Sequence, residues 1–233
     1  MDIILSGFSR AISFILSFDK ELYSIIFLSL KVSGVALIIS TLIGISIGAV
    51  VSMRRFFGRD FIISLLNTFM GLPPVVVGLF VYLLLSRSGP FGFMGLLYTP
   101  SAMAIAQTIL ATPIIAALSH AAIVNVEDTI RNAAMALGAT PLQASVKVIT
   151  EARYSITAAV IAGFGRAIAE VGAILIVGGN IAGYTRVMTT TIALETDKGN
   201  FELALALGIV LLLISLIVNT LLYWFQKRGI KQR

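Results

Sequence analysis

The feature of this sequence that most limits its fold is a series of apolar segments, each long enough to cross a bilayer, which takes about 20 helical residues. Hydrophobic residues make up 58% of the chain and charged residues only 12%, about half of the share usual in soluble domains. Inside a bilayer, backbone groups must bond within their own segment, which favours a helical bundle. We therefore expect an all-α transmembrane domain at residues 21–226, with five spans at 22–52, 61–85, 100–123, 155–177 and 201–225.

Basic residues alternate with these spans in a way that predicts the topology. Three arginines, Arg54, Arg55 and Arg59, lie between the first two spans, whereas residues 86–99 carry Arg87 alone. Short loops rich in Lys and Arg stay in the cytoplasm. The tail at 227–233 is also basic, so we expect the amino end outside and the carboxyl end inside. The formal net charge of +6 is explained by topology and does not indicate nucleic-acid binding.

Residues 1–20 form a short apolar segment that Arg10 interrupts. It is too short and broken for a confident span, and we expect an external helix lying in the membrane interface. A signal peptide is the alternative, but the segment has neither a basic start nor a small-residue cleavage site.

Two features inside the spans indicate a transport path or gate. Pro73 and Pro74 must break the helix of the second span, because neither residue has a backbone N–H. The bend either lines the path or is a kink tolerated against a neighbour. Arg166 and Glu170 are four residues apart in the fourth span and can meet on one face, either in a functional site or in a structural ion pair.

The fourth span also carries small residues at helical spacing, which let another helix approach closely. We expect the loop at 178–200 after this span either to dip into the membrane or to meet an external partner. Its first residues, Gly178, Gly179 and Asn180, join the candidates for the path or gate.

The longest polar stretch, at 126–153, reads as two short amphipathic helices at a bend. Gly138 supplies the left-handed position that ends many helices. Thr140 is a good N-cap, and Gln143 completes a capping box. A bent helix pair between spans is suited to lie at the membrane surface and to fit a groove on a partner.

Several motifs resemble the permeases of ABC importers. Asn132-Ala133-Ala134, Gly138 and Val148 follow the spacing of the family's EAA loop, although Asn132 replaces its Glu and Thr150-Glu151 replace its Leu-Pro. From about residue 22 to 225, the chain resembles the oxyanion branch of the family, and within that branch the permease subunits of tungstate importers. The segments that carry this resemblance are GLPP at 71–74, GFGRAIAEVG at 163–172, VGGNIAGYTRVMTT at 177–190 and IALE at 192–195.

The resemblance implies a subunit of a prokaryotic inner-membrane importer that translocates tungstate or, alternatively, molybdate or sulfate. It implies a homodimer in membrane lipid, two ATP-binding-cassette subunits that hold ATP and Mg, and an external oxyanion-binding protein. The expected ATPase-coupling residues are Ala133, Ala134, Leu137, Gly138, Ala139, Thr140 and Gln143. Tungstate and molybdate are tetrahedral dianions of nearly the same size, which nothing in these spans separates.

Other classes of function find little support in the sequence. No Gly-Lys pair occurs, so the chain has no Walker A loop, and we expect no cofactor of its own. Ser119 and His120 are adjacent and do not face each other on a helix, so we expect no catalytic residue. With no cysteine and one histidine, we expect no metal site. A secondary transporter remains an alternative, but it would show inverted repeats.

Overall fold

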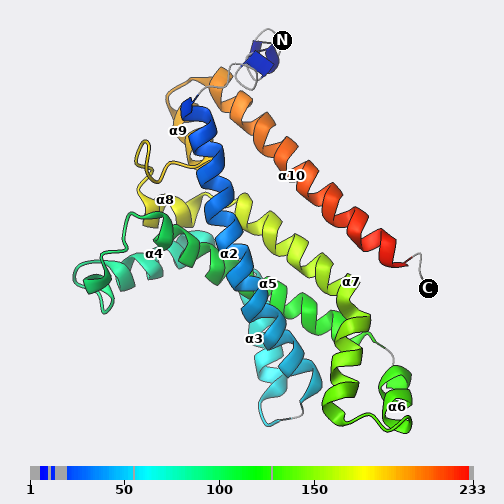
Figure 1. The fold of residues 1–233 in the computed structure, drawn as a ribbon. Coiled ribbons are helices and arrows are strands. Elements are labelled where there is room, and N and C mark those ends of the chain that lie inside the picture. Colours follow the sequence, from blue (N-terminus) through cyan, green and yellow to red (C-terminus); the bar gives the residue numbers. More distant parts are fainter. Residues whose placement is uncertain (1–5, 10–11, 14–19, 55, 127, 231–233) are drawn as a thin grey trace.

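The computed structural model describes residues 6–9, 12–13, 20–54, 56–126 and 128–230, and within these it contains helices and loops but no strand (Figure 1). The all-α expectation is therefore confirmed. The elements are α2 (Lys20–Met53), α3 (Arg59–Met70), α4 (Pro74–Leu85), the short helix η1 (Gly92–Met94), α5 (Pro100–Val124), α6 (Asp128–Ala136), α7 (Pro141–Ile168), α8 (Gly172–Gly178), α9 (Met188–Asp197) and α10 (Phe201–Ile230).

Three helices in the described part of the chain, α2, α5 and α10, are long and apolar enough to cross a membrane by themselves. Two bent pairs add to these: α3 and α4 meet at 102°, and α7 and α8 meet at 56°. If each pair crosses as one broken span, the number of spans is five.

The centre of the bundle is α5, which packs against α2 and α7. Of the most apolar part of α5, 67% is buried, against 22% in α10, which runs along the outside (Figure 1). Glycines bring α2 close to α5: a Cβ added at Gly48 would lie 2.7 Å from the Ala116 carbonyl oxygen. Small residues in this role are typical of helices that associate in membranes.

The two ends of the bundle differ in what they present. The turn between α2 and α3 and the turn between α6 and α7 lie at the same end, whereas α9 and the start of α10 lie at the other (Figure 1). The basic loop and the polar stretch at 126–153 are therefore on one side of the molecule, as the predicted topology requires.

The helix boundaries differ from the sequence expectation around α7. The predicted second short helix of the polar stretch and the first part of the predicted span at 155–177 form one helix, α7, because no glycine or proline interrupts it between residues 142 and 162. The break comes later, at residues 169–171, inside the predicted span. The expected loop at 178–200 also contains a helix, α9.

Two expectations concern parts of the chain that are only partly described. The interfacial helix at 1–20 lies mostly outside the described residues. Of the basic tail at 227–233, residues up to Ile230 continue α10, and the rest lies outside the description.

Candidate functional site

The bend between α6 and α7 is closed by backbone hydrogen bonds around Gly138. Gly138 has φ +88°, its N–H donates to the Met135 carbonyl, and the Ala139 N–H donates to the Ala134 carbonyl at 3.0 Å. These two bonds make a Schellman motif, which ends a helix at a residue with positive φ. Gly138 occupies that residue because it has no Cβ to clash with the backbone.

The start of α7 is fixed by the capping box that the sequence predicts. The Thr140 hydroxyl accepts the Gln143 N–H at 3.3 Å, and the Gln143 side-chain oxygen accepts the Thr140 N–H at 2.8 Å. Further along α7, Val148, Ala152 and Ile156 pack against the end of α5. The bend is therefore held from inside the bundle and leaves its outer surface free.

That outer surface is apolar and grooved. Leu137, in the turn after α6, is 90% exposed. Leu142 is 75% exposed, because α7 turns Ala144 and Val148 inward instead. Between α6 and α7 lies an open groove of about 760 Å³, edged by an ion pair of 2.9 Å between Lys147 and Glu151. The other lining residues are Ile130, Ala133, Ala134, Leu137, Gly138, Ala139 and Gln143, which include all the predicted coupling residues except Thr140.

The proline break between α3 and α4 lies beside Arg166. Pro73 is the N-cap of α4 in an extended conformation, and Pro74 is its first residue. The carbonyl of Leu72, at the break, accepts a hydrogen bond from Arg166 Nη2 at 3.4 Å. This hydrogen bond brings together the proline break and Arg166, which the sequence analysis treats as separate candidates for the path or gate.

Glu170 sits at the second break, between α7 and α8, and is almost fully buried. Its Oε2 lies 3.8 Å from Arg166 Nη2, a wide ion pair, while its Oε1 accepts the Ala173 N–H at 3.0 Å. Its backbone carbonyl accepts the Thr189 hydroxyl at 2.8 Å. The Glu170 carboxylate thus provides an acceptor for a backbone N–H at the start of α8, and its backbone carbonyl connects this break to α9.

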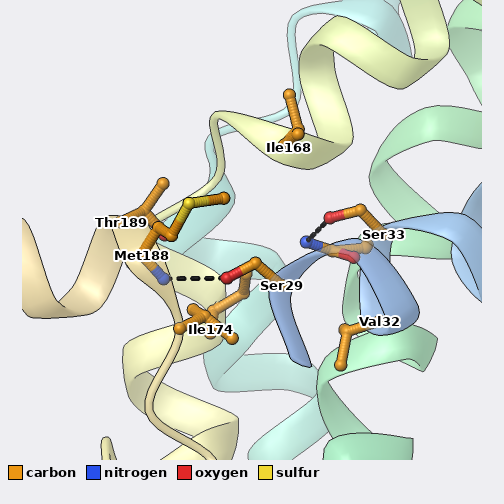
Figure 2. Close-up of a pocket in the computed structure, with 9 residues that line it drawn as sticks. Ser29, Val32, Ser33, Ile168, Ile174, Met188 and Thr189 are labelled. Atoms are coloured by element: carbon orange, nitrogen blue, oxygen red, sulfur yellow. Dashed lines mark hydrogen bonds between the residues drawn. The ribbon is translucent and has the colours of Figure 1, made fainter. Parts of the chain in front are cut away.

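A buried cluster of polar side chains forms hydrogen bonds with backbone groups near the helix breaks (Figure 2). The sequence reasoning missed this cluster. Gln107 Nε2 donates to the Ala167 carbonyl at 2.8 Å and to the Ser33 hydroxyl at 3.3 Å. The Ser29 hydroxyl accepts the Met188 N–H at 2.9 Å, at the start of α9. The available signal was Gln107, the one carboxamide in the span at 100–123, since polar residues inside a span mark constrained sites.

We expect Gln107→Leu to lower stability by about 1–2 kcal/mol, because the Ala167 carbonyl loses its short bond from the buried Gln107 amide and keeps the longer one from the Glu170 N–H, at 3.3 Å. Thermal unfolding in detergent measures the effect. Thr108→Val is the matched control, since the Thr108 hydroxyl bonds only within its own helix. Equal losses in the two variants would contradict a special role for Gln107.

Gly178, Gly179 and Asn180 are not brought together with Arg166 and Glu170. They lie at the opposite end of α8, whose seven residues span about 10 Å. Gly179 ends α8 with φ +71°, and a Cβ there would lie 2.8 Å from the Tyr98 ring. The structure therefore separates the predicted path residues into two groups.

The turn between α9 and α10 is held by Glu195, the last residue of the IALE segment. Its carboxylate accepts hydrogen bonds from Lys198 Nζ and Asn200 Nδ2, each at 2.9 Å. The Lys198 hydrogen bond is the main reason that the pKa of Glu195 is lowered. Among the described residues, no three His, Asp or Glu side chains gather as metal ligands would.

An apolar bundle with broken helices, whose freed backbone groups bond to buried side chains, is the architecture of a membrane transport protein. The family described as "binding-protein-dependent transport system inner membrane component" matches residues 40–231. The chain belongs to this family, which confirms the resemblance drawn from the motifs. It is a multi-pass inner-membrane permease subunit without an ATPase site of its own.

Relatives match over nearly the whole chain. A probable anion ABC transporter permease protein of Haloferax volcanii is 46% identical, covering 89% of this chain and 91% of its own. The tungstate uptake system permease protein TupB of Peptoclostridium acidaminophilum is 42% identical, covering 97% and 100%. Among solved structures, a bacterial alginate ABC transporter in complex with its periplasmic protein matches with a TM-score of 0.75 at 19% identity, over 92% of this chain and 82% of that one. This last match shows a shared fold.

Proposed function

We propose that this chain is the membrane-spanning subunit of an ATP-driven, binding-protein-dependent importer of tungstate. The observation that carries the proposal is the match, over 97% of the chain, to a relative named as a tungstate uptake permease. A molybdate or sulfate permease of the same family is the alternative, because these tetrahedral dianions share charge and shape.

We further propose that two copies form a C2 homodimer with the path on its axis, since one chain hardly encloses a path for an oxyanion. Each copy binds one ATPase subunit, which holds ATP and Mg, through the bend between α6 and α7 and the groove beside it. Exposed Leu137 and Leu142 support this role, because apolar side chains at a bend suit a groove on a partner.

The proposed cycle is alternating access. An external receptor delivers the anion to the outer mouth, near the group at Gly178, Gly179 and Asn180. Closure of the ATPase dimer on ATP then moves the α6–α7 bends, and the motion reaches the α7–α8 break through the rigid α7. Arg166 offers a positive charge to the anion beside the proline break.

Uptake by the reconstituted complex tests the proposed substrate. Proteoliposomes holding this permease with its ATPase are supplied with the receptor, ATP and tungstate. We expect ATP-dependent tungstate uptake, with molybdate or sulfate competing only in large excess. Uptake of molybdate or sulfate at concentrations where tungstate neither enters nor competes would contradict the assignment.

Single cysteines test the topology, since the chain has none of its own. Ser88→Cys lies in the loop expected outside, and Phe57→Cys lies in the basic loop expected inside, with both side chains exposed. An impermeant thiol reagent added to intact cells should label residue 88 and spare residue 57. The reverse pattern would invert the proposed orientation.

A further inference from the structure

Helix α3 carries three distinct faces along its 12 residues. The first is half-buried and apolar, with Ile62, Leu66 and Met70 at four-residue spacing on the side that packs against α5. The second is exposed and apolar and consists of Phe61, Leu65 and Phe69, which are 71%, 37% and 38% exposed. The third is exposed and polar and consists of Asp60, Ser64, Asn67 and Thr68, and exposed Gly71, just after the helix, continues it.

The polar face differs from the outer surfaces of the neighbouring helices. Helix α4 exposes only apolar side chains, among them Val75, Leu79 and Phe80, as expected against lipid. In hydrocarbon a polar group without a hydrogen-bond partner costs several kcal/mol. The Asn67 amide has no side-chain or backbone partner among the described residues. A face of this kind is stable in a bilayer only where it meets water or another polar surface.

The position of α3 indicates which of these it meets. The helix begins after the basic loop and is about 18 Å long, so it ends near the middle of a hydrocarbon core of about 30 Å. Its polar face ends at Gly71, and the next residue, Leu72, accepts the hydrogen bond from Arg166. The polar face therefore leads from the basic loop to Arg166, the cation beside the proline break.

We propose that the polar face of α3 lines the aqueous half of the translocation path between the basic loop and Arg166, and that Ser64, Asn67 and Thr68 contact the passing oxyanion and its water. This inference rests on the proposed function. Hydroxyl and carboxamide groups offer hydrogen bonds to an anion without the full charge that would hold it in place. Asp60 lies in the first turn, where the helix dipole favours a carboxylate and Arg54 and Arg59 are near in sequence. The Phe61, Leu65 and Phe69 face lies against lipid.

Cysteine accessibility tests the proposal on the assembled permease–ATPase complex. Asn67→Cys and Ser64→Cys lie on the polar face, and Leu65→Cys and Phe61→Cys are matched controls on the apolar face. Each is treated with an impermeant, cationic methanethiosulfonate in membrane vesicles that expose the cytoplasmic side. A thiol in hydrocarbon does not ionise, so we expect residues 64 and 67 to react at least about tenfold faster than residues 61 and 65.

The proposal also predicts that modification of the polar face changes the rate of transport. Modification of Asn67→Cys should lower tungstate uptake, and modification conditions should leave the cysteine-free parent unchanged. Equal reaction rates on the two faces would overturn the proposal. So would protection of residue 67 together with a disulfide between two copies, because the face would then be a dimer contact.

A charge substitution gives a second, independent readout. Asn67→Asp places a negative charge beside the anion and should lower the initial uptake rate about tenfold relative to Asn67→Gln, which keeps a neutral amide at the same place. Uptake that is unchanged in Asn67→Asp would overturn the proposal. Absence of tungstate uptake by the parent would instead contradict the proposed function, and the labelling pattern would still decide where the face lies.

Discussion

Gly138→Val is expected to uncouple the permease from its ATPase while leaving insertion and dimerisation intact. Gly138 has φ +88°, which a β-branched residue adopts only under strain of about 1–3 kcal/mol. A bias of that size changes the population of the bend by about 5- to 150-fold. The Schellman motif would open, the start of α7 would move relative to α6, and the groove that we propose for the ATPase would be misplaced.

The structure makes this substitution a clean test of backbone conformation. Apart from the residues next to it in the chain, no atom lies within 4 Å of a Cβ placed at residue 138, so overlap of that Cβ with other parts of the fold does not contribute. Gly138→Asn is the matched control, because Asn tolerates positive φ, and it should retain the ATPase. ATPase co-purification and oxyanion uptake are measured together. If Gly138→Val keeps both at parental levels, this bend is not the coupling element.

Arg166→Ala is expected to be more damaging than Glu170→Ala. Removing Arg166 leaves the carboxylate of Glu170, 3% exposed, with the Ala173 N–H as its remaining donor. Breaking a buried pair in this way costs about 3–5 kcal/mol, and the low end applies here because the Arg166 side chain is 33% exposed and the pair is 3.8 Å wide. The Leu72 carbonyl and the passing anion would also lose their cation.

Glu170→Ala removes a different interaction. The partly exposed Arg166 remains solvated, and the main loss is the acceptor for the Ala173 N–H, about 1–3 kcal/mol. Glu170→Gln keeps an oxygen that can accept the Ala173 N–H but removes the negative charge, so it separates the effect of the hydrogen bond from the effect of the charge. Thermal unfolding and uptake should show that the double mutant loses less than the sum of the two single mutants. Strict additivity would show that the two residues act separately.

Local sequence determined the bend of the polar stretch in detail. Gly138 and the Thr140–Gln143 capping box act through atoms only a few residues apart, so their geometry could be predicted without the rest of the fold. The apolar segments likewise determined a helical membrane protein, because hydrocarbon leaves few alternatives for the backbone. The two proline residues also predicted a helix break from local structure alone, because neither has a backbone N–H.

Only the tertiary structure decided what fills the breaks. Gln107 and Ala167 are 60 residues apart, and Ser29 and Met188 are 159 apart, so no local pattern connects them. Which face of α7 is buried was likewise decided by packing: Ala144 and Val148 fit against the bundle, and the larger Leu142 is left outside. Helical periodicity tells which residues share a face, but the neighbours that a helix meets determine whether that face turns to the core, to lipid or to water.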